Sequence, residues 1–225
     1  MVLSLAAAFV LGLPTTASAA SITCRVNGVS VTSDVIDDNG GSALIECPSI
    51  PKGVTIGGRG GNGNDGDITG AGDIKVVGGK GWYAGVGSDA DGGDGGYGNN
   101  GTLTTISVPD GTNDVTVISG DGEHGKNSGE GGNGGHGNHS ALTVTGELAV
   151  TGGTGAPAGP EGSEGGNGGD GNNKKIAVVE GPANLLGGDG GEGKPGGKGG
   201  LGNNGTVQGP FKATDGKSGP TDDDE

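Results

Sequence analysis

Hydrophobic residues along this chain occur in short runs that alternate with polar residues, and long glycine-rich stretches separate these runs. Residues 142–145 and 148–151 alternate about a Gly-Glu turn, and the pairs 103–108 with 114–118 and 176–179 with 184–186 have the same form. A period of two is typical of strands with one buried face. The pattern therefore predicts an all-β chain, with no helix in the mature protein.

The N-terminal part carries the same alternation without the glycine. Residues 22–26 and 29–31 flank an Asn-Gly pair that favours a hairpin turn, residues 37–41 predict a second turn, and residues 43–47 a third strand. In an exported chain, Cys24 and Cys47 are expected to form a disulfide, and the alternative is two free buried thiols. Closing a loop of roughly 24 residues would contribute about 3 kcal/mol. We expect a disulfide-tied β cap over 20–51.

Between these runs, one eight-residue phrase, Gly-Gly-x-Gly-Gly-x-Gly-Asn, occurs five times. The copies occupy residues 57–64, 92–99, 131–138, 165–172 and 196–203. Glycine at places 1, 2, 4, 5 and 7 has a period of three, which is the period of a polyproline II helix. Such a rod has no internal hydrogen bonds, so it needs lateral partners. The phrase predicts a bundle of glycine rods, and the alternative is a flexible glycine-rich chain.

An apolar residue follows each phrase at a constant distance. The residue five places after the last glycine of each copy is Ile68, Leu103, Leu142, Ile176 and Val207. A disordered chain would not keep that offset, so we favour an ordered repeat. The asparagine that ends each phrase suggests a change of backbone direction, since asparagine tolerates positive φ.

These elements combine into a polyglycine II repeat of five modules. Each module is a strand, a turn, a strand, a glycine rod leading outward, a tip loop and a glycine rod leading back. The expected domains are a signal peptide (1–19), the β cap (20–51), the glycine-rich repeat domain (52–216) and an acidic disordered tail (217–225).

Composition narrows the possible functions. Of 225 residues 60 are glycine, and with 28% hydrophobic residues the chain cannot fill an ordinary core of this size. A net charge of −15 disfavours nucleic acid and anionic membranes as partners. The apolar start followed by Ala-Ser-Ala is typical of a cleaved secretory signal, so we expect a secreted, extracellular protein without membrane insertion.

The loops at the rod tips vary in length and chemistry, as recognition loops on a regular scaffold do. They comprise residues 82–91, 123–130, 156–164 and 191–195. Trp82 and Tyr83 are adjacent in a chain with few aromatic residues, and they could anchor a ligand or cover the end of the bundle. The candidate binding residues are Trp82, Tyr83, Asp89, Asp91, His124 and Lys126.

Metal binding and catalysis have weaker support in the sequence. The stretch 60–65 matches the opening of a calcium-binding nonapeptide repeat, but asparagine or histidine replaces its aspartate in the later copies. His136 and His139 are three residues apart, and we interpret them as solvent-exposed rather than as zinc ligands. No nucleophile, base and acid stand in a recognisable set, so we expect no enzyme, no cofactor and no resident metal.

The glycine phrases with interposed loops resemble the receptor-recognising tail-fibre adhesins of T-even-like phages, whose polyglycine II helices form a sandwich with distal loops that touch the host. They are also similar to the glycine-rich surface repeats of mycobacteria and to glycine-rich antifreeze proteins. The resemblance covers about 57–204 and implies adhesion to an extracellular ligand, a glycan or a protein. The alternatives are a structural envelope or matrix component, a calcium-dependent β-roll and an ice-binding protein.

Overall fold

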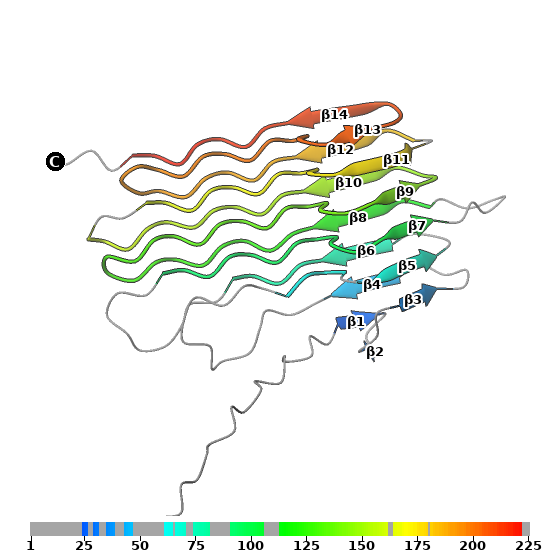
Figure 1. The fold of residues 1–225 in the computed structure, drawn as a ribbon, viewed down its shortest axis with the longest axis horizontal. Coiled ribbons are helices and arrows are strands. Elements are labelled where there is room, and N and C mark those ends of the chain that lie inside the picture. Colours follow the sequence, from blue (N-terminus) through cyan, green and yellow to red (C-terminus); the bar gives the residue numbers. More distant parts are fainter. Residues whose placement is uncertain are drawn as a thin grey trace, which may run out of the picture.

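The computed structural model describes the backbone of 24–26, 29–31, 35–38 and 43–46, and residues 61–64, 66–70, 74–81, 91–105, 113–161, 164–179 and 181–221. This part of the chain contains strands and no helix, as expected. It also has no helical segment of the length and hydropathy needed to cross a membrane. Figure 1 shows the strands stacked at one end of the molecule, with wavy glycine segments extending from them.

The strands form two sheets. The eight-stranded sheet contains, in spatial order, β14 (Phe211–Thr214), β12 (Ala183–Leu186), β10 (Leu148–Thr151), β8 (Val115–Ile118), β6 (Ile74–Val77), β4 (Ala43–Glu46), β1 (Cys24–Val26) and β2 (Val29–Val31). The six-stranded sheet contains β13 (Thr206–Val207), β11 (Lys175–Val179), β9 (Leu142–Val144), β7 (Leu103–Thr105), β5 (Asp67–Gly70) and β3 (Val35–Asp38). Apart from the pairings that β1 makes, every pairing within each sheet is parallel.

From β3 onward, consecutive strands belong to different sheets, so each repeat makes one coil of a flattened spiral. β7 lies in the six-stranded sheet, and β8, the next strand along the chain, lies in the eight-stranded sheet. Each strand pairs with its counterpart in the neighbouring coil, as Leu148 of β10 does with Val115 of β8. The strands on either side of the turn expected at 27–28 are present and pair antiparallel, as β1 and β2, while residues 27 and 28 lie outside the described residues. The prediction of a turn over 37–41 is wrong for its first two residues, because Asp37 and Asp38 belong to β3 and pair with β5.

The core lies between the two sheets and consists of stacked columns of like residues. The apolar residue at the fixed offset from each phrase forms one column, in which Leu103 pairs with Ile68 on one side and Leu142 on the other. The order inferred from that offset is therefore present. The fully buried core residues, each at most 1% exposed, are Ile68, Ile74, Val76, Leu103, Val115, Val117, Leu142, Val144, Leu148, Val150, Ile176, Ala183 and Leu185.

The phrase-final asparagines form a second buried column, which the sequence analysis did not predict. The amide of Asn138 donates to the side-chain oxygen of Asn172 (2.9 Å), and its own oxygen accepts from the amide of Asn99 (2.9 Å). The same bond links each copy to the next: parallel bridges join Asn64, Asn99, Asn138, Asn172 and Asn203. The expectation of positive φ at these positions is wrong, because among the described non-glycine residues only Asn127 has a positive φ.

This asparagine ladder also fixes the junction between glycine segment and strand. The Asn138 amide donates to the carbonyl of Ser140 (2.8 Å), two residues onward, and Asn172 does the same to Lys174 (3.1 Å). Asparagine satisfies both requirements because its side chain carries a donor and an acceptor. Asparagine at this place therefore reflects side-chain hydrogen bonding rather than backbone conformation.

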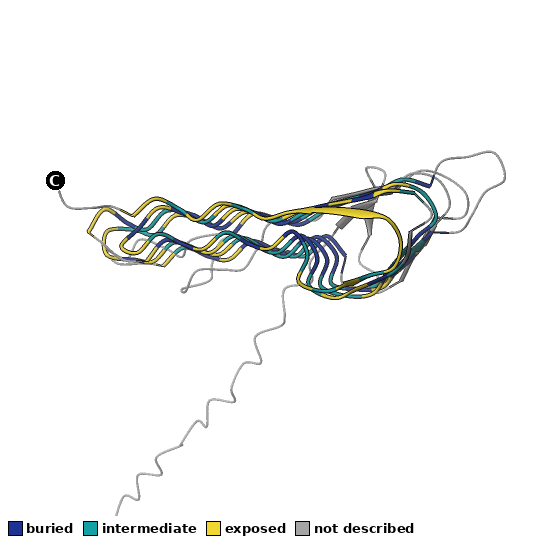
Figure 2. Cartoon of the chain, turned by 90° about the horizontal axis from the view of Figure 1, so that it is seen from above, coloured by how far each residue is buried: buried dark blue, intermediate teal, exposed yellow. Residues whose placement is uncertain are grey.

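The glycine segments form two layers that meet at the tips, as Figure 2 shows from above. The five phrases, here called the returning segments, form one layer, in which the first phrase is described from residue 61 onward, and the outgoing segments that follow β6, β8, β10, β12 and β14 form the other. The last outgoing segment continues beyond the boundary expected at 216: Gly219 donates to Gly197, and Thr221 bridges to Gly193. Residues 222–225 of the predicted tail lie outside the described residues.

Candidate functional site

Hydrogen bonds within the glycine layers repeat every three residues and decide where a side chain can stand. The amides at places 1, 4 and 7 donate to the next returning segment, as Gly134 does to Asn167 (2.8 Å) and Gly137 to Asp170 (2.8 Å). The amides at places 2 and 5 donate across to the outgoing layer, as Gly135 does to Gly120 (2.9 Å). A Cβ added at these glycines would overlap a backbone atom of the neighbouring segment. Among places 1 to 7, therefore, only places 3 and 6 can carry side chains, and these face outward, whereas the asparagine at place 8 points into the buried ladder.

The cross-layer bonds form an unbroken zigzag through the molecule. Each glycine donates to the glycine before it in the series and accepts from the one after it, at 2.7 to 2.9 Å. In order, the residues are Gly61, Gly79, Gly96, Gly120, Gly135, Gly153, Gly169, Gly188, Gly200 and Gly216. Because both layers contribute alternately, neither is stable in this arrangement without the other.

The outward side chains stack into columns that are themselves hydrogen-bonded. At place 3, the Asp94 carboxylate accepts from the backbone amide of Asn133 (2.8 Å), and the side-chain oxygen of Asn133 accepts from the backbone amide of Asn167 (2.8 Å). At place 6, the amide of Asp170 donates to Nδ1 of His136 (2.9 Å), and the amide of Leu201 donates to the Asp170 carboxylate (2.8 Å). Side-chain oxygens and one ring nitrogen thus accept from the backbone amides that no neighbouring carbonyl reaches, and they hold each column in place.

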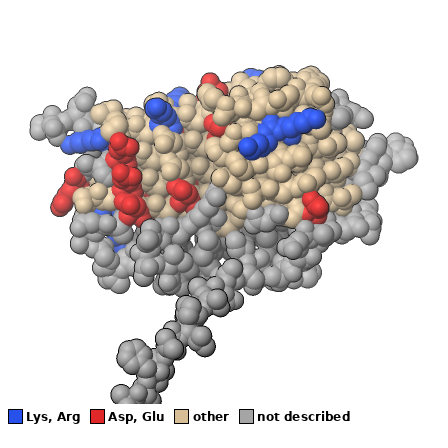
Figure 3. Space-filling view, viewed as in Figure 1, with Lys and Arg blue, Asp and Glu red and all other residues tan. Residues whose placement is uncertain are grey.

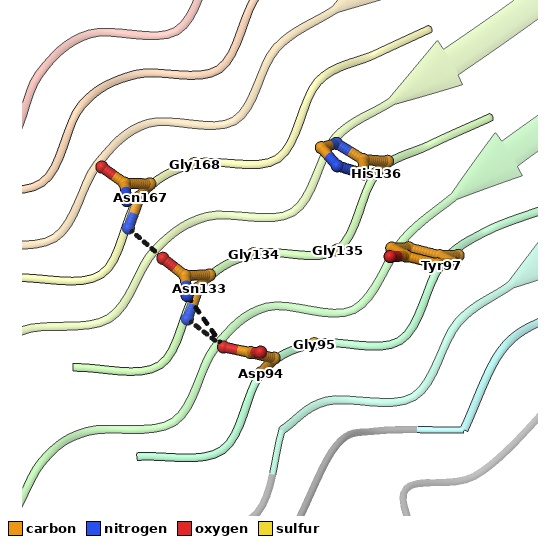
Figure 4. A pocket seen from close by; sticks show the side chains of 9 residues that line it. All are labelled: Asp94, Gly95, Tyr97, Asn133, Gly134, Gly135, His136, Asn167 and Gly168. Carbon is orange, nitrogen blue, oxygen red and sulfur yellow. Dashed lines mark hydrogen bonds between the residues drawn. The ribbon is translucent and has the colours of Figure 1, made fainter. Parts of the chain in front are cut away.

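A shallow groove of about 350 Å³ lies between these two columns (Figure 4). One wall contains Asp94, Asn133 and Asn167, and the other contains Tyr97 and His136. The floor is backbone alone, formed by Gly95, Gly134, Gly135 and Gly168. A second groove of about 530 Å³ begins at Asn167 and extends to the tips, where Glu164 and Pro195 line it. Together they make a polar channel across the face of the returning layer.

Three aromatic rings gather beside this groove. Tyr97 stacks on His139 with a centroid distance of 4.3 Å, and His136 lies 5.5 Å from Tyr97 and 5.4 Å from His139. The two histidine rings are nearly parallel, at 8°. All three residues are half-buried, so the interpretation of the histidines as solvent-exposed is wrong. They come together because Tyr97 and His136 share place 6 on adjacent segments, and His139 stands three places beyond His136.

The candidate residues at the tips are only partly described. Trp82, Tyr83 and Asp89 lie outside the described residues. Asp91 is exposed, and its carboxylate accepts from the amide of Glu130 (3.0 Å). His124 is exposed and Lys126 is half-buried, and both belong to the tip of the next coil. The described members of the set therefore lie on neighbouring coils at one end of the layers, away from the ring cluster.

Charge is sparse on the face of the molecule in Figure 3. Several acidic side chains form a column toward the tip end of the glycine segments, others lie apart from it, and a group of basic side chains lies toward the strand end. Lys80 and Glu123 form an ion pair of 3.4 Å between neighbouring outgoing segments. Within the described ranges, no three His, Cys, Asp or Glu residues are grouped so that they could hold a metal ion.

The groove and the ring cluster were missed at the sequence level, although a signal for them exists. Aligning the five phrases by place puts Tyr97 directly before His136, and Asp94 before Asn133 and Asn167. The alignment alone does not show that the phrases stack in parallel register, and the bridges between the asparagines establish this register. Comparison of the chain with protein-family models, with curated proteins and with solved structures found no match.

Proposed function

We propose that this protein is an exported, non-enzymatic scaffold that recognises a ligand on a cell surface or in an extracellular matrix. The observation that carries the proposal is the distribution of glycine and of larger side chains over the places of each returning segment. Glycine occupies every place that packs against backbone, and the places that project outward carry varied polar and aromatic side chains. A rigid layer of this kind holds side chains in fixed register, which favours recognition.

The glycine segments are proposed to be polyglycine II helices. Support comes from the three-residue period of the hydrogen bonds and from their direction, since the amides donate to neighbouring segments rather than along the chain. The close approach of backbones at places such as Gly134 agrees with this conformation, because only glycine leaves two edges of such a rod bare.

The N-terminal cap is proposed to be tied by a Cys24–Cys47 disulfide. Its support is the exported character of the sequence and the antiparallel pairing of β1, which begins at Cys24, with β4, which ends one residue before Cys47. Cys47 lies outside the described residues. Reducing the bond should lower the free energy of unfolding by about 3 kcal/mol, measured by denaturant unfolding with and without reductant. An unchanged midpoint in the Cys24→Ser variant would contradict the disulfide.

Recognition is proposed to involve the tip loops, since they vary in length and sequence on a regular frame. The mature chain should bind saturably to intact cells, cell-wall material or matrix. Scrambling residues 82–91 should weaken that binding by about tenfold or more, because the segment contains the two adjacent aromatic residues. The matched control is Lys75→Ser, at an exposed position of β6 remote from the tips. Absence of saturable binding by the unaltered chain would overturn the proposed function.

A further inference from the structure

We infer that the groove between the two outward columns is a binding site for a glycan chain, neutral or bearing amino groups, that lies across the glycine segments. This inference rests on the proposed function and names the ligand class and its site. The occupant would run along the groove from Asp94 toward Asn167, contacting one returning segment after another (Figure 4).

The spacing of the walls suits a sugar chain better than an extended peptide. Neighbouring segments joined by backbone hydrogen bonds lie about 4.7–4.9 Å apart, so each wall presents one side chain per such step. The walls are three residues apart, about 9 Å for a rise of 3.1 Å per residue. A linear chain of 1→4-linked pyranoses advances by close to one segment spacing per sugar. An extended peptide places side chains on one face every two residues, about 6.6–6.8 Å apart, so its side chains would not match the spacing of the side chains in the walls.

The floor offers a peptide no main-chain donors. The amide of Gly95 donates to Asn133, that of Gly134 to Asn167 and that of Gly135 to Gly120, each at 2.8 to 2.9 Å. Strand addition, the usual way in which a sheet captures a peptide, needs unused backbone groups at an edge. Donors to a ligand must therefore come from the walls. The Asn133 and Asn167 oxygens each accept from the next segment, and the Asn133 amide also donates to Asp94 (3.0 Å), so the second amide hydrogen and second lone pair of each group are what match the hydroxyl groups of sugars.

The ring wall supplies the apolar contact. Tyr97 and His136 line the groove, and with His139 they form a stacked cluster at 4.3 to 5.5 Å. Mutual stacking and half-burial restrict the rings before a ligand arrives, so little side-chain entropy remains to be lost on binding. Because the rings are stacked, each turns a face toward its neighbour in the column, and the ring edges that border the groove can pack against the carbon–hydrogen groups of pyranoses, with the tyrosine hydroxyl as a polar group beside them.

Charge selects among glycans. Asp94 stands in one wall, and Asp170 follows His136 in the place 6 column that forms the other. Glu164 lines the adjoining groove, and Lys198 is the basic residue among the described members of the place 3 column. The whole chain carries a net charge of −15. Sulfated or uronic-acid polymers would therefore be repelled, and neutral or amino-bearing chains would not.

The test measures binding of the purified mature chain to three soluble oligosaccharide sets: cello-oligosaccharides, chitosan oligosaccharides and heparin fragments. We expect binding to one or both of the first two sets and none to heparin. Tyr97→Leu should weaken binding by about tenfold or more, whereas Tyr97→Phe, which keeps the ring, should stay within about twofold of the unaltered chain. Thermal unfolding of each variant shows whether the fold is retained.

A matched pair of charge variants provides a second, independent measure. Asp94→Asn in the groove and Asp189→Asn on the outgoing layer both keep an oxygen that accepts from the next segment, and both remove one charge. Only Asp94→Asn should weaken binding of the amino-bearing set. Equal binding by the unaltered chain and a folded Tyr97→Leu variant would overturn the inference, as would preference for heparin. If the chain binds surfaces through its tip loops but binds none of the three sets, this inference fails and the proposed function stands.

Discussion

Gly135→Ala is expected to prevent the glycine layers from packing. The Gly135 amide donates to Gly120, and its carbonyl accepts from Gly153, both at 2.9 Å, so this residue lies in the middle of the cross-layer zigzag. A Cβ there would overlap the carbonyl of Gly96, which is backbone and cannot rotate away. Overpacking between rigid groups, together with the lost hydrogen bonds, should cost about 3 kcal/mol or more.

The measurement is denaturant unfolding combined with hydrogen exchange at the glycine amides. Gly135→Ala should lower the unfolding midpoint and remove protection from the neighbouring amides of both layers. Replacing glycine also restricts the unfolded chain, but that effect would stabilise the variant, by about 0.4–1 kcal/mol. Lys198→Ala, at an exposed place 3, is the matched control and should change stability by less than about 0.5 kcal/mol. Retained protection in Gly135→Ala would contradict backbone-to-backbone packing of the layers.

Much of the coil could be predicted because its requirements are local. The apolar residue at a fixed distance from each phrase, such as Leu142, is the first or second residue of a strand in every copy, and it is fully buried in the first four copies and half-buried in the last. The three-residue glycine period is local in the same way, because the hydrogen bond that Gly134 donates to the next segment is repeated three residues later by Gly137. Local regularity of this kind can be read from one copy and checked against the other four.

The partition into two sheets could not be predicted in the same way. Whether β7 pairs with β8, its neighbour in sequence, or with β9, a full coil away, depends on which partner completes the buried face. The final strand, β14, alternates apolar and polar residues, yet all four of its residues are exposed, so alternation alone does not indicate a buried face there. The ring cluster depends on register as well, because Tyr97 and His139 are 42 positions apart in the printed numbering and meet only when the segments stack.

Asn138→Ala is expected to destabilise the protein far more than its small loss of volume suggests. Asn138 is fully buried, and its side chain bonds to Asn99, Asn172 and Ser140. Removing it leaves the amide of Asn99 and the side-chain oxygen of Asn172 without this partner, away from water. Each orphaned buried group costs about 1–3 kcal/mol, so we expect a total loss of about 2–5 kcal/mol in the free energy of unfolding. The exposed Asn184→Ala in β12 serves as control, with an expected change below about 0.5 kcal/mol.

Asn138→Asp distinguishes hydrogen bonding from packing, because the side chain keeps its shape and loses its donor. An ionised carboxylate would still accept from Asn99 but would face the side-chain oxygen of Asn172 and the carbonyl of Ser140. Burial and these two oxygens favour the protonated form, which raises the pKa of the introduced carboxyl in the folded state above its value in the unfolded chain. The folded state then binds the proton more tightly, so stability is greatest below the unfolded-state pKa and falls as pH rises toward the folded-state pKa. Denaturant midpoints of this variant, compared with those of the unaltered chain across acidic and neutral pH, should diverge as pH rises. A gap that does not change with pH would show that the ladder acts through packing alone.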